Sequence, residues 1–192
     1  ERLNLGGGFG IRYTGERELD IAAFAAMAKA VTAELGCGLV FEPGRFLVAA
    51  AGALISRILL VKTGSDGRRF VVLDAGMNTL LRPALYGAVH PMFPLHRGPA
   101  DREEVADVVG PICESSDVFA RDVPLARARA GESVAFANAG AYGAVMASDY
   151  NSRGMAGEVL VDGARTAVVK PPRPPAALLA DETVPAWLQT VP

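Results

Sequence analysis

The 192-residue sequence predicts an α/β segment followed by an antiparallel β domain. Two observations lead to this prediction. Before residue 46, an apolar stretch, a glycine run, a helical pattern and a second apolar stretch follow one another, which is the order of a βαβ unit. After residue 46, short apolar stretches alternate with turn sequences such as Gly64-Ser65-Asp66-Gly67.

Each element of the α/β segment has its own signal. Leu3 to Leu5 is expected as a strand that runs into Gly6-Gly7-Gly8-Phe9-Gly10. A helix is expected from about Asp20 to Leu35, because apolar residues recur at helical spacing and Asp20 is a suitable N-cap. Leu39 to Phe41 is the second strand, and Glu42-Pro43-Gly44-Arg45 follows it. Such a unit leaves apolar faces and strand edges uncovered, so we expect a missing segment or another chain to cover them.

Strand patterns dominate the chain after Arg45, and a proline-rich tail ends it. Asp162-Gly163 is the strongest turn signal and predicts a hairpin between two short apolar stretches. Four prolines between Pro171 and Pro175 predict a polyproline-like spacer. The strands expected in this region are Ala49–Val61, Arg69–Leu73, Val134–Ala137, Tyr142–Met146, Glu158–Val161 and Thr166–Val169.

Composition excludes several classes of protein. Basic and acidic side chains number 19 and 21, for a net charge of -2, which argues against a strongly basic nucleic-acid-binding protein. The longest apolar run, Phe46–Ile55, is too short to cross a membrane. Cys37 and Cys113 cannot form a disulfide framework and show no zinc-ligand spacing, so we expect a reducing cytoplasm and no metal site.

Two loops of the α/β segment could bind an anion. Backbone N–H groups of the Gly6–Gly10 run could approach a phosphate closely. The run does not fit the dinucleotide-binding fingerprint, however, and could simply be a tight turn. Glu42 and Arg45 follow a predicted parallel strand, at the end where the sites of α/β proteins form. The carboxylate could bind a ring nitrogen, and the guanidinium could bind a phosphate or a carboxylate. The alternative is a loop ion pair.

Three motifs of the β region carry groups that suit catalysis or substrate binding. In Cys113-Glu114-Ser115-Ser116-Asp117, the thiol could donate a proton and Glu114 could bind an ammonium group, although a lone cysteine is often only a small buried side chain. Arg82, with Tyr86 nearby, could clamp a substrate carboxylate or be a surface arginine. Glycines clear space around Tyr142, which could instead pack on a sheet.

Six motifs in this order resemble the C-terminal part of the diaminopimelate decarboxylases: LNLGGGFG, FEPGR, LDAGMN, RPALYGAVHP, GPICESSD and GAYGAVMASDYNSR. The resemblance extends from Leu3 to about Met155. GGGFG and EPGR are shared with ornithine and arginine decarboxylases, whereas CESSD and RPALYGA are specific. The resemblance implies the last βα unit or units of a (β/α)8 barrel, followed by an antiparallel β-barrel or β-sandwich domain. Residues 1–48 would end the barrel, 49–170 would form the β domain and 171–192 a tail.

The resemblance also implies a function. It is the decarboxylation of meso-2,6-diaminopimelate to L-lysine and CO₂, in lysine biosynthesis in the cytoplasm, with pyridoxal 5′-phosphate as cofactor. Cys113 would protonate the carbon that has lost CO₂, and it would reach the partner subunit's site together with Glu114. A homodimer with shared active sites is therefore implied. The cofactor-binding residues would be Gly8, Glu42 (at the pyridine nitrogen), Gly44, Arg45 and Tyr142, and the substrate-binding residues Arg45, Arg82, Tyr86, Glu114 and Tyr142.

One feature departs from the family pattern. The family's Schiff-base lysine lies on an early barrel strand, and Lys29, Lys62 and Lys170 are not in its motif. We therefore expect a C-terminal fragment that is inactive alone. Two alternatives stay open. One is a decarboxylase of another basic amino acid, of the ornithine, arginine or carboxynorspermidine type, and the other is a non-catalytic dimerisation module.

Overall fold

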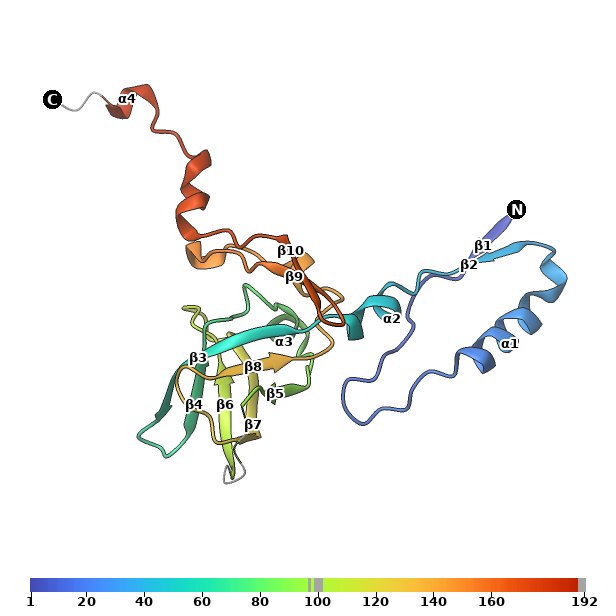
Figure 1. The fold of residues 1–192 in the computed structure, drawn as a ribbon. Coiled ribbons are helices and arrows are strands. Elements are labelled where there is room, and N and C mark those ends of the chain that lie inside the picture. Colours follow the sequence, from blue (N-terminus) through green and yellow to red (C-terminus); the bar gives the residue numbers. More distant parts are fainter. Residues whose placement is uncertain (97, 99–101, 190–192) are drawn as a thin grey trace.

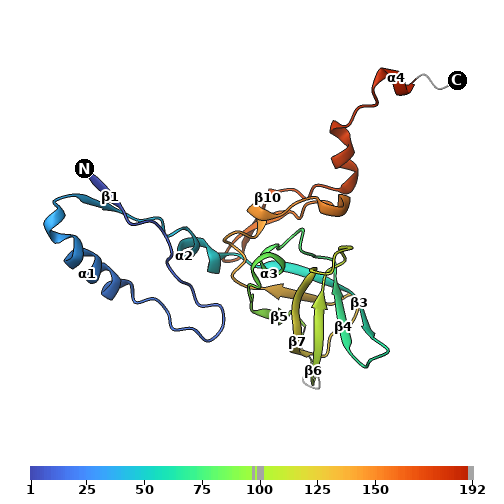
Figure 2. The same cartoon turned by 180° about the vertical axis from the view of Figure 1, so that it is seen from behind.

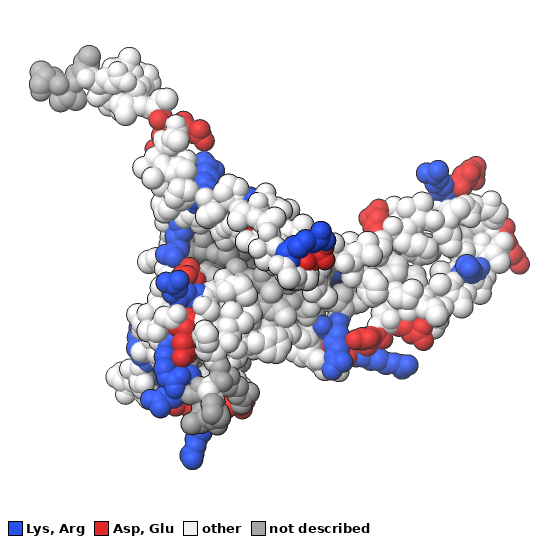
Figure 3. Space-filling view, in the orientation of Figure 1, with Lys and Arg blue, Asp and Glu red and all other residues white. Residues whose placement is uncertain are grey.

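The computed structural model describes residues 1–96, 98 and 102–189. Figures 1 and 2 show three parts: an N-terminal βαβ unit, a sheet domain, and a C-terminal segment that extends away from the sheet. The helix α2 (Gly44–Val48) joins the first two parts. In Figure 3, basic and acidic side chains are intermixed on the visible face of the sheet domain. Within the described residues, no helix has both the length and the apolarity that a membrane span requires.

The N-terminal part confirms the predicted βαβ order. β1 (Arg2–Asn4) pairs in parallel with β2 (Gly38–Val40), and α1 (Ile21–Thr32) lies between them along the chain. The carboxylate of Asp20 accepts the backbone N–H of Ala23 at 2.9 Å, so the predicted N-cap is confirmed. A short 3-10 helix, η1 (Ala33–Leu35), ends at Gly36, whose φ of 57° takes the chain out of the helix.

This unit leaves an apolar groove open between α1, β2 and α2. The groove has a volume of about 680 Å³. The rings of Phe9 and Phe24 pack edge to face in its wall, with centroids 5.0 Å apart. Val31 and Leu47 are 72% and 67% exposed. The apolar surface that the sequence predicts is therefore present, and the segment expected to cover it stays a prediction.

The first long strand of the sheet domain starts later than predicted. Residues 49–51 form a 3-10 helix, η2 (Ala49–Ala51), and the first long strand is β3 (Leu54–Thr63). The prediction of a strand from Ala49 is therefore wrong. Three consecutive alanines favour helical backbone, and the Gly140 N–H donates to the Ala49 carbonyl at 3.0 Å, which fixes this turn.

Six strands form one curled sheet in the order β5–β8–β3–β4–β6–β7. The edge strands β5 and β7 contact each other, so the sheet is nearly closed. The predicted antiparallel arrangement is right for four of the five neighbouring pairs, but β4 and β6 are parallel. The chain makes a crossover between β4 and β6, which parallel pairing requires. The remaining bounds are β4 (Arg69–Leu73), α3 (Arg82–Tyr86), β5 (Met92–Pro94), β6 (Glu103–Val109), β7 (Val118–Ala126) and β8 (Ser133–Phe136).

The core fills the inside of the curled sheet. Leu73, Val108 and Val134 are completely buried, and the rings of Phe119 and Phe136 pack 4.7 Å apart. Alternate residues of each strand point inward, so strands distant in sequence share this core. The core holds the loops at the ends of β4, β6 and β8 in fixed positions.

A second strand prediction is wrong. Residues 142–146 form a turn and the 3-10 helix η3 (Ala144–Met146) in place of a strand. Tyr142 has a φ of 60°, and a Cβ on Gly143 would lie 2.2 Å from the Ala139 carbonyl oxygen. This close approach bends the chain sharply, so residues 142–146 cannot extend.

The predicted hairpin is confirmed near the C-terminus. β9 (Glu158–Asp162) and β10 (Arg165–Lys170) form a separate antiparallel pair, with Gly163 in the turn at a φ of 58°. The polyproline-like spacer is shorter than predicted. Pro174 has φ -70° and ψ 157°, the polyproline II region, but a 3-10 helix, η5 (Pro175–Asp181), follows directly. The last element is α4 (Ala186–Gln189).

Candidate active site

The glycine run and Glu42 are held together at the end of the β1–β2 pair. The side-chain amide of Asn4 connects them, because its oxygen accepts the Gly6 N–H at 2.8 Å and its nitrogen donates to Oε1 of Glu42 at 2.7 Å. The Glu42 N–H donates to the Gly6 carbonyl at 2.8 Å. A Cβ on Gly7 would lie 2.8 Å from the Glu42 carbonyl oxygen, so a glycine is needed there. The carboxylate of Glu42 is thus fixed on one oxygen and exposed.

The same end of the βαβ unit carries donors that suit an anion. Gly8 has a φ of 84° with open space beside it, and Gly44 begins α2. Within the described part of the chain, the buried Nε of Arg45 has no hydrogen-bond partner. Backbone N–H groups and a guanidinium suit a phosphate, and a carboxylate suits a protonated ring nitrogen. These residues therefore fit pyridoxal 5′-phosphate. The structure contains no Glu42–Arg45 ion pair among the described residues.

Arg82 lies at the centre of an aromatic cluster in the sheet domain. It is 9% exposed, and its guanidinium carbon lies 5.8 Å from the ring of Tyr86 and 5.6 Å from that of Tyr142. Nη2 of Arg82 lies 3.5 Å from the hydroxyl oxygen of Tyr13. The structure thus brings together three predicted substrate-binding residues, and the alternative of a surface arginine is wrong.

His90 packs against Tyr13, at the edge of this cluster. Its Nδ1 lies 3.0 Å from the Ala137 carbonyl oxygen, and its ring packs edge to face against Tyr13 at 5.5 Å. Burial lowers the pKa of His90, and the nearby positive charge of Arg82 acts in the same direction. The imidazole is therefore neutral at neutral pH, and a neutral ring does not repel the guanidinium of Arg82.

Cys113 and Glu114 lie on the loop between β6 and β7. Both side chains are exposed, so the alternative of a buried structural cysteine is wrong. The carboxylate of Glu114 accepts the hydroxyl of Tyr150 at 3.4 Å and the N–H of Ser115 at 3.2 Å. Tyr150 begins the 3-10 helix η4 (Tyr150–Ser152), so a second segment orients this carboxylate.

Comparison with protein families identifies the family of this chain. The model for "Pyridoxal-dependent decarboxylase, C-terminal sheet domain" matches residues 30–140, more than half of the chain. The chain belongs to the pyridoxal-dependent decarboxylases. Its curled sheet is the C-terminal sheet domain of these decarboxylases, and the βαβ unit precedes it.

Curated relatives of this chain include diaminopimelate decarboxylases. It is 42% identical to the one from Zymomonas mobilis, over 98% of this chain and 44% of the relative. It is also 42% identical to the one from Methanothermobacter thermautotrophicus, over 98% of this chain and 45% of the relative. The resemblance inferred from the motifs is confirmed. The chain spans less than half the length of these relatives.

Solved structures show the same relationship. A diaminopimelate decarboxylase from M. jannaschii matches with a TM-score of 0.89 and 35% identity, over 98% of this chain and 44% of that chain. One from Helicobacter pylori, complexed with L-lysine, matches with a TM-score of 0.86 and 35% identity, over 93% and 44%. A lysine/ornithine decarboxylase from Vibrio vulnificus, complexed with cadaverine, matches with a TM-score of 0.68 and 27% identity, over 78% and 40%.

The predicted site residues of the chain fall into three groups. One contains Glu42 and Arg45, another surrounds Arg82, and the third contains Cys113 and Glu114. Within the described residues, no hydrogen bond, ion pair or ring contact joins the third group to the first. Its expected role in a partner subunit's site stays a prediction.

Sequence reasoning did not assign a role to several supporting residues. Tyr13 contacts Arg82 across 69 positions, and no local pattern indicates such a contact. Asp117 belongs to the CESSD motif, but its burial depends on folding around Gly76 and Gly110. A signal was available for His90, which follows Arg82 within one motif.

Proposed function

We propose that this chain is the C-terminal part of a cytoplasmic decarboxylase that uses pyridoxal 5′-phosphate to convert meso-2,6-diaminopimelate into L-lysine and CO₂. The proposal rests on the exposed Cys113–Glu114 pair, which lies on a loop of the sheet domain in a chain that is 42% identical to a diaminopimelate decarboxylase over 98% of its length. A thiol beside a carboxylate supplies a proton donor and an anion for the substrate's ammonium group.

The βαβ unit would bind the cofactor. Gly8, Gly44 and Arg45 would hold its phosphate, and Glu42 would keep its ring nitrogen protonated. When bound, the cofactor would supply an electron sink for the carbon that loses CO₂, and Glu42 would maintain it by keeping the ring nitrogen protonated. Asn4 supports this role, because its bond to Oε1 fixes the orientation of the Glu42 carboxylate.

The sheet domain would bind the substrate and deliver the proton. Arg82 is positively charged and sits among aromatic rings, which favours binding of a carboxylate at the non-reacting end. Glu114 would bind the ammonium group of that same end, and Tyr86 and Tyr142 would line the space. Arg45 would also lie near the substrate, and Tyr142 would also touch the cofactor. Holding both charges of the non-reacting end orients the carbon that loses CO₂ toward the thiol of Cys113.

A homodimer with shared sites is part of the proposal. Cys113 and Glu114 of one subunit would serve the site formed by the partner's βαβ unit. Within the described residues, no hydrogen bond or ion pair joins them to Glu42 or Arg45 of the same chain, as this arrangement requires. One substrate would then contact two subunits.

A substrate panel on the complete protein with pyridoxal 5′-phosphate tests the function. We expect CO₂ and L-lysine from meso-2,6-diaminopimelate, and little CO₂ from ornithine, arginine, lysine or carboxynorspermidine. Glu114→Gln should raise KM for diaminopimelate, because it removes the charge that binds the ammonium group. Faster turnover of ornithine or another amino acid would favour the second candidate, a decarboxylase of another basic amino acid. Failure of the complete dimeric protein to release CO₂ from any substrate would favour a non-catalytic module.

A further inference from the structure

A buried carboxylate lies beneath the Cys113 loop. Asp117 is 4% exposed, and each of its oxygens accepts a backbone N–H. Oδ1 accepts from Met77 at 2.6 Å, and Oδ2 accepts from Ile112 at 2.6 Å. Ile112 directly precedes Cys113, and Met77 belongs to the turn that leads to α3 and Arg82. One carboxylate therefore links the loop of the proton donor to the turn before the substrate-binding arginine.

The backbone closes tightly around this carboxylate. A Cβ on Gly110 would lie 2.3 Å from Oδ2 of Asp117, and one on Gly76 would lie 3.0 Å from it. The Gly110 N–H donates to the Asp117 carbonyl at 3.0 Å, and the Asp117 N–H donates to the Glu114 carbonyl at 3.1 Å. The loop is therefore closed by its own backbone bonds as well as by the side chain.

A buried charge needs compensation to be tolerated. Burial raises the pKa of Asp117, and the two backbone N–H bonds and the positive charge of Arg153 act in the opposite direction. Hydrogen bonds to a carboxylate are short and directional. They specify the separation of the two loops more closely than an apolar side chain could.

We propose that Asp117 is a positioning residue that sets the place of Cys113 and Glu114 relative to the turn leading to Arg82. The inference rests on the proposed function, because it assigns Cys113 the proton transfer. In that step the bond to the carboxylate carbon breaks, CO₂ leaves, and the thiol proton adds to the carbon. The thiolate then regains a proton from solvent.

Two variants of the complete enzyme disturb this link in different ways. Asp117→Asn has the same shape, but its amide nitrogen would face one of the two N–H donors, so one bond is lost. Gly110→Ala keeps the carboxylate and pushes it away from its place. If Asp117→Asn does not fold, Gly110→Ala carries the test.

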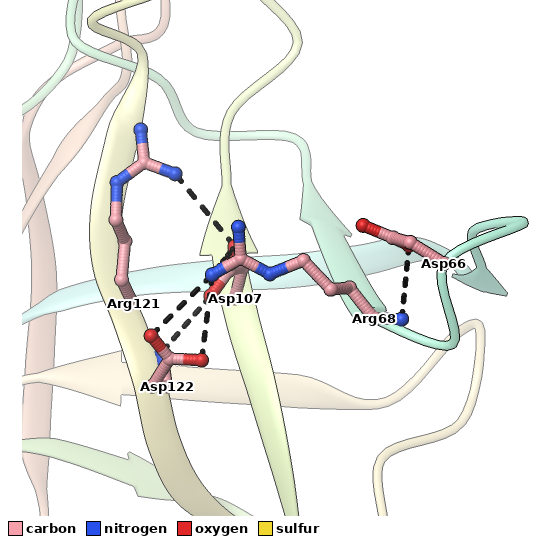
Figure 4. A network of polar contacts seen from close by, with 5 residues as sticks. All are labelled: Asp66, Arg68, Asp107, Arg121 and Asp122. Carbon is pink, nitrogen blue, oxygen red and sulfur yellow. Dashed lines mark hydrogen bonds and ion pairs between the residues drawn. The ribbon is translucent and has the colours of Figure 1, made fainter.

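Asp107→Asn is the matched control. Asp107 is 2% exposed on β6, and its Oδ1 accepts the Asp122 N–H at 2.9 Å. Arg68 and Arg121 lie 3.5 Å and 3.7 Å from its Oδ2 (Figure 4). The control therefore removes a buried carboxylate that also binds backbone, but one whose hydrogen-bond and ion-pair partners among the described residues lie outside the Cys113 loop.

The first readout is turnover of folded protein. Misplacing a reacting group by about 1 Å can cost about 100-fold in rate, so we expect kcat of both variants to fall by about 10- to 100-fold. The second readout is stereochemical. In D₂O, the lysine formed carries one deuterium on the carbon that lost CO₂, and a fixed thiol delivers it to one face. Wild type and Asp107→Asn should give one configuration, and the two variants a mixture. A merely structural role would not produce this mixture.

The outcomes separate the two proposals. If Asp117→Asn and Gly110→Ala keep wild-type kcat and a single configuration, the positioning role is overturned. If the wild-type enzyme makes no lysine, the proposed function fails, and the link is then tested by alkylation of Cys113 and by hydrogen exchange. Asp117→Asn should speed amide exchange at both Met77 and Ile112 and change the alkylation rate of Cys113, whereas Asp107→Asn should do neither. Unchanged rates at all three positions overturn the inference.

Discussion

Nη2 of Arg82 lies 3.5 Å from the hydroxyl oxygen of Tyr13, so the segment after the glycine run contacts the buried guanidinium of the sheet domain. A second bond holds this segment, because the side-chain nitrogen of Asn138 donates to the Arg12 carbonyl at 3.1 Å. These two contacts connect the segment that follows the proposed cofactor-binding loop to the proposed substrate-binding arginine. A substitution in this segment should therefore affect how Arg82 is held.

Tyr13→Phe tests this support. The phenylalanine keeps the ring packing on His90 and loses only the hydroxyl. A hydrogen bond of this kind contributes about 1 kcal/mol, so KM of the complete enzyme for diaminopimelate should rise about fivefold, with a smaller change in kcat. Steady-state kinetics measure both. Tyr13→Ala, which also removes the ring, should have a larger effect, and an unchanged KM in both variants would contradict the role.

Cys113→Ala tests the proton donor. The thiol acts on the substrate carbon and has no proposed contact with the cofactor phosphate. Turnover should therefore fall by about 10²–10⁴-fold, the usual range for general acid catalysis, while the affinity for pyridoxal 5′-phosphate changes little. Kinetics and a cofactor titration measure the two effects. If turnover is unchanged, the thiol has no catalytic role.

Subunit exchange tests the shared sites. Cys113→Ala enzyme is mixed with a variant that lacks the Schiff-base lysine, and both are inactive alone. A mixed dimer would have one site with both lesions and one with neither. After random exchange, activity should return to about a quarter of wild type, assuming independent sites. If each site is built from one chain, mixing restores no activity.

Borohydride trapping tests what this chain does alone. Lys62 lies over the ring of Phe70 at 5.6 Å, Lys170 pairs with Glu158 at 3.1 Å, and Lys29 is exposed on α1. None lies in the family's lysine motif. The 192-residue chain mixed with pyridoxal 5′-phosphate and borohydride should therefore show no stoichiometric adduct by mass spectrometry. A stoichiometric adduct on any of the three would overturn the expectation.

His90→Asn should change how stability depends on pH. Burial lowers the pKa of His90 below its ordinary value of 6.5, so the unfolded chain takes up a proton at a higher pH than the folded chain does. Between the pKa of the folded state and pH 6.5, the unfolded state binds more protons, so the free energy of unfolding rises with pH. The stability that the neutral His90 contributes is fully present above pH 6.5, and it is lost as the pH falls toward the pKa of the folded state.

Asparagine can keep the bond to the Ala137 carbonyl oxygen and does not titrate. The difference in the free energy of unfolding between wild type and His90→Asn should therefore shift in favour of the variant as the pH falls below 6.5. Denaturant unfolding at a series of pH values measures it. Groups common to both proteins cancel in the difference, so a difference that does not vary with pH would contradict the assignment.

The sequence alone determined the βαβ order, the N-cap at Asp20 and the hairpin around Gly163. Each of these depends on residues within one segment: an apolar period, a side chain that can accept a backbone N–H, and a glycine that adopts a positive φ. The motifs around Glu42, Arg82 and Cys113 could be assigned to a family for the same reason, because the order of short motifs is visible in the chain.

Only the tertiary structure decided the remaining features. The parallel β4–β6 pair depends on where a crossover places a strand, and the bend at Tyr142 depends on how closely Gly143 approaches Ala139. In the sequence, nothing distinguishes Asp117 from other polar residues. In the fold it lies between two loops, where its two oxygens accept backbone N–H groups. Local sequence patterns reflect the preferences of neighbouring residues. The burial of a side chain and its hydrogen-bond partners depend instead on segments far apart in sequence, which come together only when the sheet closes around its core.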